Sequence, residues 1–158
     1  MIKEMLGVQQ GILADLHQDH EKVAGLIEQM LKSEDAKERG AIFKEVMSEL
    51  LAHSQAEQSV LYRKLEKSDT EKSRSFAYEG DNEHHIVEQQ LQQMARSRSK
   101  ASEQWTAMAT VLRELVNHHV TEEESTGFSR ANSEFDADEL EKLGQQFRRQ
   151  KEKLMAEA

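Results

Sequence analysis

The chain has 158 residues, which suits one domain that is long enough to bury a single hydrophobic core. It contains no cysteine, so disulfides, thiolate metal sites and cysteine nucleophiles are excluded, and a reducing compartment fits. Its formal net charge of -9 at pH 7 argues against binding to the phosphate backbone of nucleic acids, which requires clustered Lys and Arg.

The N-terminal stretch MIKEMLGVQQGILADLHQDH has an apolar core too short for a secretory signal. No window of the sequence approaches the roughly 18 apolar residues of a membrane span. We therefore expect a cytoplasmic protein with no membrane partner and no nucleic-acid partner. The sequence leaves monomer and homodimer open.

Helix-forming residues dominate the composition, and proline is absent, so the chain is predicted to be all-α. The first helix is expected at about residues 11–31, where apolar residues recur at alternating steps of three and four. His20 occupies one of these inward positions. The apolar members of the series are Leu13, Leu16, Val23, Ile27 and Met30.

The second predicted helix opens with Asp35 and Glu38, which are spaced as a capping box. Along this helix, His53 and Glu57 continue the apolar series and should point into the protein. They lie four residues apart, so they share one helix face. Burying an unpaired carboxylate costs several kcal/mol, so the pair requires hydrogen-bonding partners or a metal ion.

Two further helices follow the same scheme. Ser68 and Glu71 are spaced as a capping box for the third helix, whose inward face includes His84. The polar stretch RSRSKASEQW is predicted to be a turn, and the fourth helix carries His119 and Glu123 in its inward series.

The last predicted helix, at about residues 136–156, is short and amphipathic and begins with a capping box of Asp136 and Glu139. We expect it to pack on the outside of the bundle. Its basic edge is interpreted as a solvated face because acidic residues are interspersed with it. The basic residues are Arg148, Arg149, Lys151 and Lys153.

The two halves of the chain resemble each other. DHEKVAGLIEQM aligns with EHHIVEQQLQQM, and LLAHSQAEQSVLY aligns with VNHHVTEEESTGF. The repeat predicts an up-down-up-down four-helix bundle with pseudo-twofold symmetry and a short additional C-terminal helix. We expect a single domain over residues 1–158, with the core bundle at about residues 11–130.

Each of the four core helices thus offers one inward histidine, and the second and fourth each add a glutamate at i+4. Imidazole and carboxylate ligands together suit iron, manganese or zinc, whereas calcium takes oxygen ligands only. The set exceeds what one tetrahedral zinc ion requires. The number of candidate ligands therefore fits a site with two metal ions better than a site with one.

These segments resemble the hemerythrin-like, or HHE cation-binding, domains. The resemblance rests on DHEKV, HSQAEQSVLY, EHHIV and HVTEEESTGF, in that order, and covers roughly residues 13–128. It implies two non-haem iron ions, bridged by two carboxylates and an oxo or hydroxo group, with zinc or manganese as possible substitutes. The implied ligands are His20, His53, Glu57, His84, His119 and Glu123, with Glu57 and Glu123 as the bridges.

The third helix departs from the oxygen-carrying members of this family. Glu88, four residues after His84, stands where those proteins have a second histidine. If Glu88 is a metal ligand, its negative charge favours the ferric state and makes redox or peroxide chemistry, iron handling or sensing more fitting than reversible oxygen carriage. If Glu88 faces solvent, the metal keeps an open position.

Neighbouring residues offer a second choice for the fourth helix. His118 and Glu122 have the same spacing as His119 and Glu123 and also agree with part of the apolar pattern. We favour His119 with Glu123 because an aromatic residue then follows the glutamate at the same distance in both halves.

His85 and His17 are further histidines outside the favoured set. Only His84 keeps the third helix in phase with the first, so His85 is not favoured as a ligand. His17 is expected at the surface or hydrogen-bonded to a bridging carboxylate. The rest of the acidic run around Glu123 is expected to be solvated.

The leading functional hypothesis is a di-iron protein that interacts with dioxygen, peroxide or a related small molecule. A ferroxidase or peroxidase is the enzymatic alternative, although Glu-x-x-His pairs typical of ferritin-like enzymes are missing at His53 and His119. The other alternative is a metal-stabilised interaction or sensor module that uses its last helix or the Met1 to Val8 arm to touch a partner.

Overall fold

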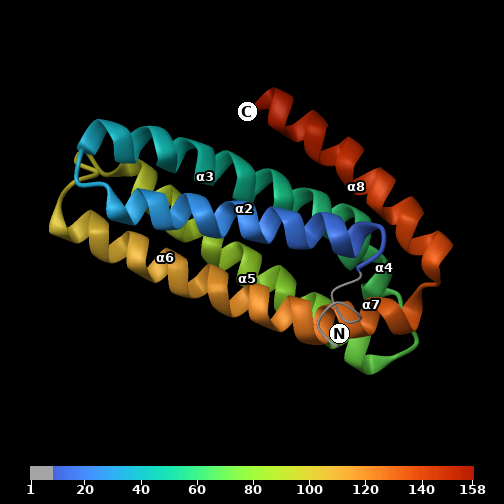
Figure 1. Ribbon diagram of the computed structural model, residues 1–158. Coiled ribbons are helices and arrows are strands. Elements are labelled where there is room, and N and C mark those ends of the chain that lie inside the picture. Colours follow the sequence, from blue (N-terminus) through green and yellow to red (C-terminus); the bar gives the residue numbers. More distant parts are fainter. Residues whose placement is uncertain (1–8) are drawn as a thin grey trace, which may run out of the picture.

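The structure is a computed structural model that describes residues 9–158, and the arm formed by the first eight residues lies outside this range. The described residues form five helical rods and no strand (Figure 1). This confirms the all-α prediction. The rods are α2 (Ile12–Lys32); α3 (Ala36–Glu57), continued by the π-helix η1 (Gln58–Tyr62) and α4 (Arg63–Glu66); α5 (Glu71–Arg96); α6 (Glu103–Glu122), continued by the π-helix η2 (Glu123–Gly127) and α7 (Phe128–Glu134); and α8 (Ala137–Glu157).

The first four rods run up and down beside one another, and α8 crosses the outside of α2 and α3 (Figure 1). Two separate clusters of buried apolar side chains fill the bundle. One cluster contains Leu16 and Tyr62, and the other contains Val23 and Trp105. The buried histidines and glutamates belong to neither cluster, so a polar layer divides the core.

The helix caps agree in part with the sequence. Asp35 accepts a hydrogen bond from the backbone N–H of Glu38, and Asp136 forms the complete capping box with Glu139. The prediction for Ser68 is wrong. Its hydroxyl accepts from the N–H of Thr70 and donates to the carboxylate of Glu134, while α5 begins without a side-chain cap.

The two π-helices begin at the predicted bridging glutamates and were not expected. Glu57 is the last residue of α3 before η1, and Glu123 is the first residue of η2. A π-helical turn adds one residue to the helical repeat and is often found at functional sites. Here each π-helix starts at or directly after the buried glutamate of the polar layer, at positions of the two halves that differ by one residue.

The C-terminal helix is long rather than short, with 21 residues, as many as α2. Two glycines let its backbone approach the start of α2. A Cβ atom on Gly11, which has φ 56°, would lie 2.0 Å from the carbonyl oxygen of Leu140. A Cβ atom on Gly144 would lie 2.8 Å from the backbone nitrogen of Ile12. No residue larger than glycine fits these contacts unchanged, so α8 docks directly on α2.

Gly144→Ala should therefore lower the stability of the protein, whereas Gly25→Ala, a matched control, should raise it. Both glycines lie inside helices, where alanine is favoured by about 1 kcal/mol. At Gly25 an added Cβ meets nothing within 4 Å, but at Gly144 it meets backbone atoms of α2. Overpacking of this kind costs about 1–3 kcal/mol. Urea denaturation followed by circular dichroism measures both changes, and equal shifts in the two variants would contradict the tight docking of α8.

None of the described helices combines the length and the apolar character needed to cross a membrane.

Candidate metal centre

Two groups of buried side chains could each hold a metal ion. The first consists of His20, His53 and Glu123, and the second of Glu57, His84 and His119. Within each group, one ligand atom per residue lies within 4.8 Å of the others. All six residues are among those expected from the sequence, and all are buried.

The two groups follow the repeat but exchange their glutamates. The histidines of the first group come from α2 and α3, whereas its glutamate comes from the rod of α6. The histidines of the second group come from α5 and α6, and its glutamate, Glu57, comes from α3. Each half of the chain therefore needs the other half to complete its group.

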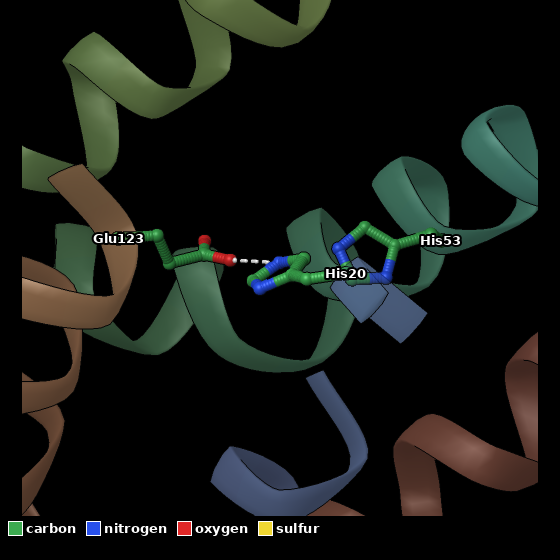
Figure 2. Close-up of side chains that lie close together, drawn as sticks. All are labelled: His20, His53 and Glu123. Carbon is green, nitrogen blue, oxygen red and sulfur yellow. Dashed lines mark ion pairs between the residues drawn. The ribbon is translucent and has the colours of Figure 1, made fainter. Parts of the chain in front are cut away.

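In the first group the side chains of His20, His53 and Glu123 face one another (Figure 2). Nε2 of His20 lies 3.0 Å from Oε1 of Glu123, and the two imidazole rings have their centroids 5.1 Å apart. Glu57 lies close by, with its Oε1 3.5 Å from Nε2 of His53.

The side chains of the second group also lie close to one another. Oε1 of Glu57 lies 3.1 Å from Nε2 of His84, and Nε2 of His84 lies 3.0 Å from Nε2 of His119. Oε2 of Glu123 is 3.7 Å from Nε2 of His119. Glu57 and Glu123 thus each touch histidines of both groups, which is the placement required of bridging carboxylates.

Five buried atoms at this centre form no well-aligned hydrogen bond among the described residues, although Nε2 of His20 lies 3.0 Å from Glu123 and Oε1 of Glu57 lies 3.1 Å from His84. Leaving buried polar groups unpaired costs several kcal/mol, so their convergence is unfavourable unless a cation lies among them. They are Nε2 of His20, Nε2 of His53, both carboxylate oxygens of Glu57 and Oε1 of Glu123. Nitrogen and oxygen donors of this kind fit iron, manganese or zinc.

Each histidine is oriented by a partner at its other ring nitrogen. A carboxylate at Nδ1 accepts its proton, which fixes the tautomer, leaves Nε2 for the metal and raises the basicity of the ligand, whereas the amide nitrogen of Gln58 donates to Nδ1 of His84. Three of the partners are carboxylates and one is an amide. Nδ1 of His20 lies 2.7 Å from Glu124, Nδ1 of His53 lies 2.8 Å from Asp19, Nδ1 of His119 lies 2.7 Å from Glu83, and Nδ1 of His84 lies 3.1 Å from the amide of Gln58.

The sequence contains a signal for these partners that we did not use. Asp19 and Glu83 each immediately precede a histidine ligand, at matching positions of the repeat, and each contacts a histidine on the neighbouring helix. Gln58 and Glu124 each immediately follow a bridging glutamate. An acidic or amide residue that recurs beside a ligand in both halves thus indicates a supporting hydrogen bond.

The expectation that the rest of the acidic run is solvated is wrong for Glu124. Its carboxylate contacts both His20 and His17, the latter at 2.9 Å from Nδ1. His17 is half-buried and reaches this supporting carboxylate rather than a bridging one. Glu124 thus links the half-buried His17 to the buried His20.

The choice in the fourth helix falls on His119 and Glu123. His118 and Glu122 are exposed, whereas the side chains of His119 and Glu123 are 9% and 1% exposed. His85 is exposed as well. The burial of these side chains agrees with the alignment of the two halves, and their roles as ligands stay predictions.

Glu88 is not brought together with the other six expected ligands. It is half-buried and lines a separate cavity of about 50 Å³ between α3 and α5, beside His84 and His85. Its role as a ligand stays a prediction. From the geometry we expect Glu88→Gln to leave the metal content unchanged, because the two groups are complete without it. Elemental analysis of the purified variant measures this, and loss of one ion would make Glu88 a ligand.

Tyr62 takes a larger part in the site than packing alone. Its hydroxyl donates a 2.6 Å hydrogen bond to Oε2 of Glu123, and its ring stacks on His84 with the centroids 5.2 Å apart. Gly80 makes room for this ring, since a Cβ there would lie 2.7 Å from it. Burial and the adjacent carboxylates hold the pKa of Tyr62 well above its usual value, so the phenol keeps its proton and remains a donor.

The neighbouring carboxylates favour protonated histidines. Burial lowers the pKa of His20 and of His53, but the contacts with Glu123 and Glu124, and with Asp19 and Glu57, outweigh it. The result is a pKa of about 9 for His20 and about 10 for His53. The stabilisation from these pairs is therefore complete below their usual pKa of 6.5 and is lost as the pH rises through about 9 to 10.

Metal binding at pH 7 should therefore release about two protons per chain, since a metal ion binds neutral imidazole. Titration calorimetry in two buffers of different ionisation enthalpy measures the number. Heats that do not depend on the buffer would contradict the protonated state of these histidines.

A small cavity of about 20 Å³ lies against the centre. The four histidine ligands line it together with apolar side chains that include Val23, Leu50, Val87 and Val116. Its volume suffices for about one water-sized molecule. Among the described residues, the site thus combines polar ligand atoms with a small and largely apolar chamber.

Comparison with known proteins agrees with this geometry. The family described as hemerythrin HHE cation binding domain matches residues 11–131. A curated protein from Nostoc sp. (strain PCC 7120 / SAG 25.82 / UTEX 2576), named DNA nickase, is 27% identical over 143 residues. The match covers 88% of this chain and 38% of that relative, so the chain spans well under half of the relative's length. No solved structure matches the chain.

Proposed function

The chain belongs to the hemerythrin HHE cation-binding domain family, and we propose that it holds two non-haem iron ions that interact with dioxygen, peroxide or a related small molecule. The observation that carries the proposal is the pair of buried groups that exchange their glutamates. His20, His53 and Glu123 would hold one ion, and Glu57, His84 and His119 the other. Bound iron would supply redox chemistry at an open coordination position.

The residues around the ligands support iron over a structural zinc ion. The carboxylates of Asp19, Glu83 and Glu124 stand behind three of the four histidines and increase their electron donation. Such donation favours the higher oxidation state of a redox metal. A closed structural zinc site would also take four protein ligands per ion, whereas each group here consists of three residues.

The chamber beside the histidines supports a small molecule as the reaction partner. Its volume of about 20 Å³ is too small for an organic substrate and matches a diatomic molecule or peroxide. The apolar walls exclude bulk water from the ligand atoms. The ring of Tyr62 and its bond to Glu123 restrict the movement of that carboxylate on the opposite side.

Metal analysis and optical spectra of protein produced with iron test the proposal. We expect about two iron ions per chain and a charge-transfer absorption in the near ultraviolet that disappears on anaerobic reduction and returns in air. Colourless protein that contains zinc, or no metal, would refute it. Turnover of ferrous iron or hydrogen peroxide that is lost in His53→Ala would instead favour the ferroxidase or peroxidase alternative.

The similarity to a protein named DNA nickase raises cleavage of DNA strands as a second candidate. The formal charge of -9 opposes binding to DNA, and the shared segment is only 38% of the relative. Incubation of supercoiled plasmid with the metal-loaded chain tests the candidate. Nicked circles that form with wild type, but not with Glu57→Gln, would support it.

A further inference from the structure

The C-terminal helix reaches one half of the metal centre, although it lies outside the residues that match the family. Nζ of Lys151, on α8, lies 2.7 Å from Oδ1 of Asp19 and 2.8 Å from Oε1 of Glu49. The other oxygen of Asp19 lies 2.8 Å from Nδ1 of His53. A continuous chain of charged hydrogen bonds therefore connects α8 to a proposed metal ligand.

The ion pairs of Lys151 are largely buried and differ in this from ion pairs on the surface. The side chains of Lys151, Asp19 and Glu49 are 16%, 15% and 4% exposed. Charge pairs shielded from water are screened less. Glu49 also pairs with Lys22 at 2.7 Å, but the lysine that pairs with Asp19 is Lys151. Phe147, one turn earlier on α8, also packs edge-on against the His53 ring at 5.7 Å between centroids.

The other half of the centre has no such contact. By the repeat, Asp19 corresponds to Glu83, which orients His119. Among the described residues, the ion pairs of Glu83 are with His119 and with the exposed His118, and no lysine or arginine reaches it. As α8 crosses α2 and α3, it covers only the first half of the bundle (Figure 1). The supporting shell of the two groups is thus unequal.

We infer that Lys151 is a positioning residue that, through Asp19, holds His53 and makes the group of His20 and His53 bind its metal ion more firmly than the other group. The inference rests on the proposed function, since it concerns the same metal centre. Without Lys151, Asp19 loses the cation that fixes its orientation, whereas Glu49 keeps its pair with Lys22. His53 then loses its restraint, while His84 and His119 keep theirs.

Lys151→Met in the full chain tests this inference, with release of ferrous iron to bipyridine under anaerobic conditions as the measurement. We expect one of the two ions to leave about tenfold faster, the usual scale for loss of a supporting contact, and the other to leave at the wild-type rate. Lys151→Arg should restore slow release. Equal rates for Lys151→Met and wild type, or equal acceleration of both ions, would overturn the inference.

Arg148→Met is the matched control on the same helix. Arg148 pairs with Asp15 at 2.6 Å, and Asp15 orients none of the histidine ligands. This variant should therefore weaken the docking of α8 without changing iron release. A change as large as that of Lys151→Met would mean that any loosening of α8 suffices, and it would overturn a specific role for Lys151. Lys151→Gln is a second variant, judged by the same outcomes if the methionine variant does not fold.

A measurement without metal separates this inference from the proposed function. In the metal-free protein, nitrogen NMR of the imidazoles should show a changed Nδ1 signal for His53 in Lys151→Met and unchanged signals for His84 and His119. If wild type takes up no metal but the His53 signal moves, the proposed function fails and the link from Lys151 to His53 stands. If wild type binds two ions and neither the signal nor the release changes, only the present inference fails.

Discussion

Glu57→Gln is expected to reduce the metal content from two ions to one or none. Glu57 is fully buried, and its two oxygens form no well-aligned hydrogen bond among the described residues. Oε1 lies 3.5 Å from Nε2 of His53 and 3.1 Å from Nε2 of His84, which belong to different groups. An amide of the same size keeps the packing but removes the negative charge shared by both positions. Elemental analysis after purification with iron measures the loss.

Glu88→Gln is the matched control for this experiment. It makes the same chemical change on a half-buried glutamate, one that lines the neighbouring cavity but belongs to neither group. Circular dichroism should report the same helical content for both variants. Two ions retained in Glu57→Gln would contradict the bridging position of this carboxylate.

Removal of the metal should lower the thermal stability of the wild-type protein by about 5–10 °C. A ligand present at about 100 times its dissociation constant stabilises the folded state by about 2.7 kcal/mol, and 1 kcal/mol corresponds to about 2–4 °C in a domain of this size. The physical cause is the cluster of unpaired ligand atoms, which a cation would satisfy. Thermal unfolding with iron and with excess chelator measures the difference.

Glu57→Gln again supplies the control, because its unfolding temperature should respond to metal or chelator less than that of wild type. If wild type unfolds at the same temperature with and without metal, the buried groups do not act as a metal site. An equal response of wild type and Glu57→Gln would place the stabilising metal elsewhere on the chain.

The six residues of the two groups could be predicted to meet in the core because they break an otherwise regular pattern. His20 and His84 occupy apolar positions at the same place in two similar segments, and a polar side chain at such a position is informative. The repeat favoured His119 over His118, and His119 is the buried one of the two. The spacing of the apolar residues and the similarity of the two halves were together sufficient to predict the helical bundle and the polar layer in its core.

The supporting residues escaped prediction because their partners lie on other helices. Asp19 is next to His20 in sequence, yet it points to His53 on α3, since neighbouring side chains on a helix diverge. Lys151 looked like part of a solvated edge because its acidic partners, Asp19 and Glu49, are more than 100 residues away. Contacts of this kind depend on how helices pack, which the periodicity of one helix does not specify.

The position of Glu88 in the third helix also depends on how the helices pack. Glu88 lies one turn after His84, and the sequence left open whether it binds the metal or faces solvent; in the structure it lines a cavity between α3 and α5. The glutamates that contact His84 and His119 come instead from α3 and from the start of η2. Because each group borrows a glutamate from the opposite half of the chain, it is complete without a contribution from Glu88.

Anomalous X-ray diffraction at the iron absorption edge, from crystals of the iron-loaded protein, tests the central claim most directly. The account predicts two iron peaks per chain, one beside His20, His53 and Glu123 and the other beside Glu57, His84 and His119. A single peak, a peak at Glu88 in place of one of these positions, or no peak within the bundle would contradict it.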